Sequence, residues 1–254
     1  MPGRDPTYNA RMNLLAFELS TEACSVAVLA GGEVRERHEI APRRHAEYAL
    51  PWAEALLAEA GLAKSRLDAV AVGRGPGAFT GVRLGISIAQ GIALALDLPA
   101  VPVSTLRALA LRALPLGAGD GARVQAAIDA RMREVYVARF RLDTGADGQR
   151  DAIADGDEAV TPPDAVAIPE GDRAWFGVGT GFGALDGALR QRFADRLVAV
   201  DAEALPHAAD VARLAAAALR RGEGIAPERL EPAYLRNDVA LTLAQQQALR
   251  AARG

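Results

Sequence analysis

The sequence contains few of the residues that build metal and redox sites. It has one cysteine, Cys24, among 254 residues, which excludes an intrachain disulfide and a cysteine-rich zinc site. The three histidines, His38, His45 and His207, do not have the spacing of a helical metal-ligand pair. The single lysine, Lys64, is not preceded by glycine, so no Gly-Lys-Ser/Thr phosphate loop is present. We therefore expect no metal site and no catalytic constellation in this chain.

The sequence also has only a small excess of one charge sign and no long apolar run. The 32 acidic and 29 basic residues leave a net charge of −3, which provides no overall basic field for binding nucleic acid. The longest nearly apolar run, residues 84–96, contains Gln90 and is too short to cross a bilayer. Residues 1–12 are polar and lack the apolar core of a signal peptide. We expect a cytoplasmic protein without membrane contact, with residues 1–12 forming a disordered extension.

Two parts of the chain repeat one order of elements on either side of a segment rich in glycine and proline, residues 115–121. The first part has predicted strands at 13–19, 24–30, 33–40, 67–73 and 100–103, and predicted helices at 45–60, 81–97 and 105–114. The second has predicted strands at 124–129, 135–142, 174–179 and 197–200, helices at 182–193 and 206–221, and a polar, irregular stretch at 144–163.

This order predicts an α/β protein with two lobes, residues 13–114 and 122–236. Each lobe is expected to be a mixed β-sheet flanked by helices, because hairpin strands are followed by alternating helices and strands. The last helix of the second lobe is able to cross back to the first. Residues 237–254 are expected to form a C-terminal helical tail.

Polar segments at strand ends are candidates for binding a nucleotide. Hydroxyls and backbone amides in a turn, and glycines in a loop that opens a helix, can approach a phosphate closely. The expected nucleotide-binding residues are Ser20, Thr21, Gly75, Gly77 and Asp129. Each of these residues also has a purely structural interpretation. The hydroxyls and Asp129 can hydrogen-bond the backbone of their own turns. The glycine-rich loop can be a tight strand-to-helix connection with Thr80 as the helix N-cap.

The helices predicted at 45–60 and 81–97 carry more apolar surface than one sheet can cover. The first has an aromatic second face, and the second has small residues at every fourth position, which permit close approach of another helix. Either the first helix is wholly buried within the chain, or its aromatic side meets another subunit. We expect the second arrangement, with this side bound to another subunit, and to a second copy of the chain when it is alone. A Gly85→Arg change is then expected to abolish pairing and to leave the fold mostly intact. The expected interface residues are Tyr48, Trp52, Leu56, Gly81, Gly85, Ile88, Ala89 and Ile92.

Four segments, in this order, resemble the TsaB family of the bacterial tRNA threonylcarbamoyladenosine machinery. They are LSTEACSVA at 19–27, GRGPGAFTGVR at 73–83, IDARMREVY at 128–136 and PAYLRNDVA at 232–240. The resemblance extends from Met12 to about Leu243. It implies two lobes of the actin-like ATPase superfamily, a fold shared with sugar kinases and with the catalytic relative TsaD, once called a glycoprotease.

The resemblance also implies a scaffold role without catalysis. TsaD-type chains carry a His-x-x-x-His metal pair where this chain has Thr105 and Leu109, neither of which supplies an imidazole. The acid that ends the first strand, usually Asp, is here Glu18. The implied partners are a TsaD-type subunit, which modifies the adenosine beside the anticodon, a TsaE-type ATPase, and tRNA through the complex. The chain itself would require no cofactor, although ATP or ADP can bind at the complex interface.

Two other functions remain open from the residues. An actin-fold phosphotransferase acting on a small metabolite would use Ser20, Thr21 and Asp129 around a nucleotide. A glycoprotease-like peptidase rests only on the older family name, because no catalytic constellation in the sequence supports it. Binding of ATP and magnesium with turnover would favour the phosphotransferase.

Overall fold

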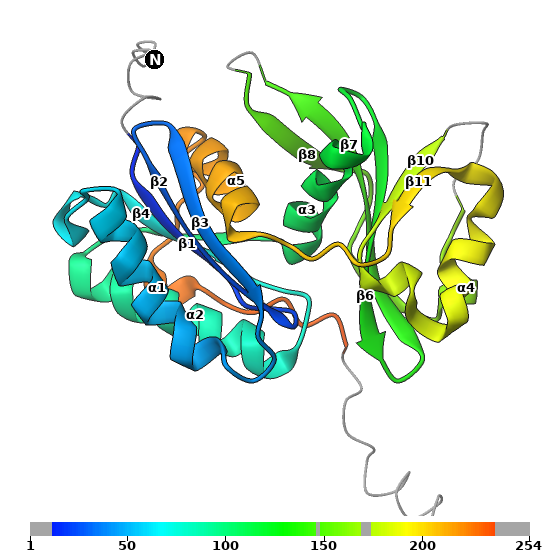
Figure 1. Ribbon diagram of the computed structural model, residues 1–254, viewed down its shortest axis with the longest axis horizontal. Helices are drawn as coiled ribbons and strands as arrows, with labels where there is room; N and C mark the ends of the chain where they lie inside the picture. The colour runs from blue at the N-terminus through cyan, green and yellow to red at the C-terminus, as the bar shows by residue number, and fades with distance from the viewer. Residues whose placement is uncertain (1–11, 146–147, 169–173, 237–254) are drawn as a thin grey trace, which may run out of the picture.

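The computed structural model describes residues 12–145, 148–168 and 174–236, which form two lobes (Figure 1). The first lobe is built on a sheet of strand order β3-β2-β1-β4-β5, and the second on a sheet of order β11-β10-β6-β7-β8, with β9 also paired to β7. In both sheets a three-stranded antiparallel meander is extended by two strands parallel to the first strand of the meander. The repeat predicted from the sequence is confirmed.

The elements before residue 117 are β1 (Leu14–Glu18), β2 (Ala23–Ala30), β3 (Glu33–Ile40), α1 (His45–Glu59), the 3-10 helix η2 (Lys64–Arg66), β4 (Ala69–Gly73), α2 (Phe79–Leu96), β5 (Ala100–Val103), α3 (Thr105–Ala110) and the 3-10 helix η3 (Leu111–Leu116). Those after it are β6 (Arg123–Arg131), β7 (Glu134–Thr144), β8 (Arg150–Ala154), β9 (Ala159–Thr161), η4 (Pro163–Ala165), β10 (Trp175–Val178), η5 (Thr180–Phe182), α4 (Ala184–Arg192), η6 (Ala194–Arg196), β11 (Leu197–Asp201), α5 (Ala208–Arg220) and η7 (Pro227–Arg229).

Burial explains the composition of the strands. Central strand β1 is buried along its whole length and is apolar up to its last residue, Glu18. Edge strand β3 is partly exposed and is mostly charged or polar, as expected for an edge that must not pair with other chains. Gly31 and Gly32, with φ of 59° and 86°, make the tight turn between β2 and β3.

Helix α5 and the continuous helical segment α3–η3 lie between the sheets, and each packs against the sheet of the other lobe. Helix α5, from the second part of the chain, packs against β1, β2, β4 and β5, whereas α3 and η3, from the first part, pack against strands of the second sheet. One hydrophobic core therefore runs through both inner sheet faces and both helices. The outer face of the first sheet is covered by α1 and α2, and that of the second by α4 (Figure 1). The shared core fixes one lobe against the other.

Four local predictions were wrong. The stretch at 144–163 contains β8 and β9, whose polar residues are tolerated at a sheet edge. The helix predicted at 105–114 is only six residues of α-helix followed by 3-10 helix, which contains Pro115. Thr80 does not cap α2, because the helix begins at Phe79 with Ala78 at the cap. Met12, assigned to a disordered extension, is 6% exposed and packs in the core. Residues 1–11 and the expected tail at 237–254 lie outside the described residues.

Candidate functional site

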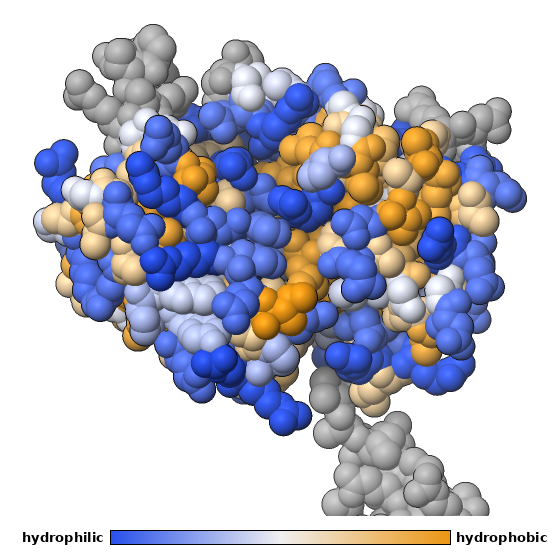
Figure 2. Space-filling view, in the orientation of Figure 1, coloured by the Kyte–Doolittle hydropathy of each residue, from blue (hydrophilic) through white to orange (hydrophobic). Residues whose placement is uncertain are grey.

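A cleft of about 1050 Å³ lies between the lobes. Ser20 and Thr21 from the β1–β2 turn and Gly77 before α2 line one wall, and Asp129 at the end of β6 lines the other. Gly75, also predicted to bind a nucleotide, does not line the cleft. Apolar side chains reach the surface along this boundary between the lobes (Figure 2). The fold thus brings four of the five predicted residues to one cavity.

The acid at the end of β1 points into the protein instead of into the cleft. Glu18 is fully buried; its Oε1 accepts a hydrogen bond from the Ser20 amide at 2.8 Å, and its Oε2 accepts one from Thr105 Oγ1 at 3.0 Å. Ser20 Oγ lies 3.0 Å from Thr105 Oγ1, which closes the network. Burial raises the pKa of Glu18, although the hydrogen bonds from Ser20 and Thr105 act to lower it. This carboxyl group is committed to an internal network and is not available to a ligand in the cleft.

The positions that match the metal pair of TsaD-type chains are both buried. Thr105 is the hydroxyl donor to Glu18, and Leu109 packs in the core between the sheets with no exposed surface. Neither side chain can provide a metal-ligand nitrogen. The structure therefore shows what occupies these two positions: one supports the buried acid and the other fills the core.

The glycines of the loop before α2 are required by contacts within the chain. A Cβ atom on Gly73 would lie 1.9 Å from Glu18 Oε2, and one on Gly77 would lie 2.3 Å from the carbonyl oxygen of Ser20. Gly75 has φ of 92°, and its carbonyl accepts the Thr105 amide at 3.0 Å. The tight-connection alternative accounts for all three glycines, so their presence does not by itself indicate a phosphate.

Asp129 stabilises its own hairpin. Its Oδ1 accepts the Arg131 amide at 2.8 Å, and its Oδ2 lies 2.9 Å from the Arg131 guanidinium. Arg131, Met132 and Arg133 all have positive φ, so this turn is strained for residues other than glycine and needs such anchors. The turn interpretation of Asp129 is the one that the hydrogen bonds support.

Residues 232–236 cross the mouth of the cleft and connect the two lobes. The Ala233 amide donates to the Arg74 carbonyl at 2.8 Å, and Tyr234 Oη accepts from Arg83 Nε at 2.7 Å. On the other lobe Arg236 Nη2 lies 2.5 Å from Glu134 Oε2. Sequence reasoning used this segment only as part of the resemblance, because an extended segment without periodicity carries no signal of what it contacts.

The predicted interface residues divide between the two sides of α1 and α2. Leu56 and Ala89, with 1% and 0% exposure, lie in the core. A Cβ on Gly81 would lie 2.0 Å from the carbonyl oxygen of Leu19, just after β1, and one on buried Gly85 would lie 3.2 Å from Val72 Cγ2 on β4. Assigning buried Leu56, Gly85 and Ala89 to a partner interface was wrong, because the small-residue stripe lets α2 approach its own sheet. Gly81 is partly exposed, and its place in an interface stays a prediction.

The other four predicted residues remain at the surface. Tyr48 and Trp52 on α1 are partly exposed, and their rings stack with centroids 4.9 Å apart. Ile88 and Ile92 on α2 are partly exposed as well. These aromatic and branched side chains belong to the rim of the outer core and reach solvent on the side away from the sheet.

The outer side of α2 has no charged residue from Leu84 to Leu96. Leu94 is 53% exposed, and Gly91, in the middle of the helix, is exposed with no atom within 4 Å of the place that a Cβ would take. Only a third of the helix is buried, and α2 is the one described helix long and apolar enough to cross a bilayer, judged by length and composition alone. A water-facing helix side is normally polar, so this side resembles a surface that another protein covers.

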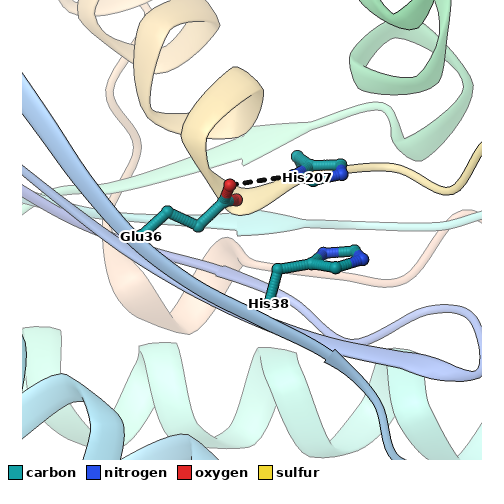
Figure 3. Close-up of side chains that lie close together, drawn as sticks. All are labelled: Glu36, His38 and His207. Carbon is teal, nitrogen blue, oxygen red and sulfur yellow. Dashed lines mark hydrogen bonds and ion pairs between the residues drawn. The ribbon is translucent and has the colours of Figure 1, made fainter.

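Glu36, His38 and His207 form the one group of three possible metal ligands in the described part of the chain (Figure 3). The rings of His38 and His207 are parallel within 1°, with centroids 3.9 Å apart. A metal bound through an imidazole lone pair lies close to the ring plane, and no point lies in both of two parallel planes. Glu36 is also engaged by Ser25, His207 and the Ala209 amide. As arranged, the group does not suit a shared metal ion.

Two lobes of one topology, with helices exchanged between them and a cleft at their junction, define a protein of the actin-like ATPase fold. The model of the family described as "TsaD: tRNA N6-adenosine threonylcarbamoyltransferase" matches residues 38–243. Proteins named "tRNA threonylcarbamoyladenosine biosynthesis protein TsaB" from Haemophilus influenzae and Escherichia coli are each 41% identical over 90% of this chain, covering 95% and 96% of their own lengths.

A solved structure described as YeaZ from Pseudomonas aeruginosa is 47% identical, with a TM-score of 0.77 over 88% of this chain and 100% of that one. The chain belongs to the TsaB family.

Proposed function

We propose that this chain is a scaffold subunit, without chemistry of its own, for the TsaD-type enzyme that makes threonylcarbamoyladenosine in tRNA. The names of its 41% identical relatives support the pathway. Its place of action is then the cytoplasm, where tRNA is modified, and a TsaE-type ATPase and tRNA join through the complex.

The arrangement inside the cleft supports a role without catalysis. A phosphotransferase needs a carboxylate that faces the nucleotide, but Glu18 is buried against Thr105 and Asp129 is bonded to Arg131. The chain then requires no cofactor, and ATP or ADP binds where this subunit meets its partner. Calorimetry of the isolated chain with ATP and magnesium tests this: the proposal expects no tight, metal-dependent binding and no turnover.

The observation that carries the scaffold proposal is the uncharged outer side of α2. Exposed Leu94 and partly exposed Ile88 leave an apolar surface that a partner would remove from water. Gly91 costs the helix roughly 1 kcal/mol relative to alanine, and no contact within the chain requires it to be small. A glycine at this place permits close approach of a helix from another subunit. We infer that the outer side of α1 and α2 binds the TsaD-type subunit, and binds a second copy when the chain is alone.

The test is co-purification with the TsaD-type subunit of the same organism, together with the mass of the isolated chain by light scattering. Leu94→Arg should abolish both associations, because it places a charge in the contact. Val198→Arg is the matched control, since Val198 is also an exposed apolar residue, 59% exposed, but lies on β11 of the other lobe. Retained association of Leu94→Arg, or equal loss in Val198→Arg, would refute the assignment of this surface.

A further inference from the structure

The N-terminus of α5 is held by side chains from the first sheet. His207 occupies the cap position without a capping bond of its own. The Ala208 amide donates to Ser25 Oγ at 2.8 Å, and the Ala209 amide donates to Glu36 Oε1 at 2.9 Å. These amides are among the first N–H groups of the helix, which have no partner inside it. The start of α5 is therefore capped by β2 and β3 and not by its own sequence.

The same carboxylate pairs with an imidazole. Glu36 Oε2 lies 2.8 Å from His207 Nδ1 (Figure 3). His207 stacks on His38, which lies two residues after Glu36 on the same face of β3 and opposite Ser25 in the sheet register. His38 Nδ1 is buried and has no hydrogen-bond partner. His207 is thus hydrogen-bonded to the carboxylate through Nδ1, whereas His38 Nδ1 makes no hydrogen bond.

Burial and the surrounding charges together disfavour a proton on His38. Besides Glu36, the charged groups nearby are Arg112 of η3 and Asp210 of α5, which are paired with each other at 3.3 Å. Asp210 is also paired with Arg213 on α5. Burial and the neighbouring His207 lower the pKa of His38, and Arg112 acts in the same direction, against the opposing effect of Glu36. Two imidazolium rings 3.9 Å apart would repel each other.

The capped start of α5 lies where the chain returns from the second lobe to the first. Ala202 and Glu203, just before it, line the cleft, and α5, just after it, packs on the first sheet. We propose that the stacked His38–His207 pair is a proton-operated latch: with one proton or none, the rings stay stacked and α5 stays capped. A second proton separates the rings and releases the start of α5, which loosens the connection between the lobes.

The experiment is a pH titration of the full chain by NMR. Nitrogen shifts of the imidazole rings report the protonation of each histidine, and amide exchange of Ala208 and Ala209, expressed as protection factors, reports the cap. Both protection factors should fall as pH decreases from 7 to 5, by up to about tenfold per pH unit between the pKa values of His38 in the closed and open forms. The fall should persist with a chelator present, because protons and not metal ions drive it.

Two variants make the test specific. His38→Gln removes the second proton site from the exposed edge strand, so the fall in protection should disappear while α5 remains capped. His45→Gln is the matched control, because His45 is a buried histidine bonded to the Thr21 and Ala23 carbonyls, away from the latch. Constant protection in the wild-type chain, an equal fall in His38→Gln, or His38 titrating like a free histidine would each overturn the proposal.

Discussion

Gly91 offers a test in which the stability of the chain and its association should change in opposite directions. It lies in the middle of α2, is exposed, and has open space around the position of a Cβ atom. Gly91→Ala should therefore stabilise the isolated chain by about 1 kcal/mol, because glycine is the poorest helix former after proline. The measurement is urea unfolding at concentrations low enough to keep the chain monomeric.

Association should respond in the other direction. If a partner helix packs over Gly91, Gly91→Leu overfills the contact at a cost of about 1–3 kcal/mol, which weakens binding by roughly 5-fold to 150-fold. Gln191→Leu, which adds the same side chain to an exposed position on α4, is the control. Unchanged binding of Gly91→Leu to the TsaD-type subunit, or a less stable Gly91→Ala monomer, would show that the reasoning is wrong.

Three other predictions concern the interior. Thr105→Val should lower the free energy of unfolding by about 1–3 kcal/mol, because it leaves Oε2 of buried Glu18 without its hydroxyl donor, whereas Thr105→Ser should be nearly neutral; equal denaturation midpoints for the two would contradict this. Burial alone would raise the pKa of Glu36, but hydrogen bonds from His207, the Ala209 amide and Ser25 lower it to about 2. The ionised Glu36 carboxylate should then contribute on the order of 3 kcal/mol to the free energy of unfolding, fully present above pH 4.5 and lost as pH falls toward 2. Acid unfolding curves of Glu36→Gln should lack this loss. Gly85→Arg, expected from the sequence to leave the fold intact, should instead unfold the chain, because it would force a side chain against Val72; a native circular dichroism spectrum would contradict that.

Local patterns determined most of the architecture. Alternating apolar runs, the Gly31–Gly32 turn and the order of helices and strands predicted two lobes of one topology, because each of these signals lies within a few adjacent residues. The residues missing from the sequence were equally informative: with no histidine at positions 105 and 109, that pair of positions cannot hold a metal.

The tertiary structure alone decided which side of each helix meets the sheet. Helix α2 is apolar almost all round, so its periodicity shows that two apolar sides exist without showing which one is inside. The close approach of Gly81 to Leu19 and of Gly85 to Val72 decides which side faces inward, and Gly91 then lies on the outer side. The same holds for contacts between residues far apart in sequence. Glu18 and Thr105 are hydrogen-bonded although 87 positions separate them, and Glu36 and His207 although 171 do. Local sequence patterns do not predict such pairs.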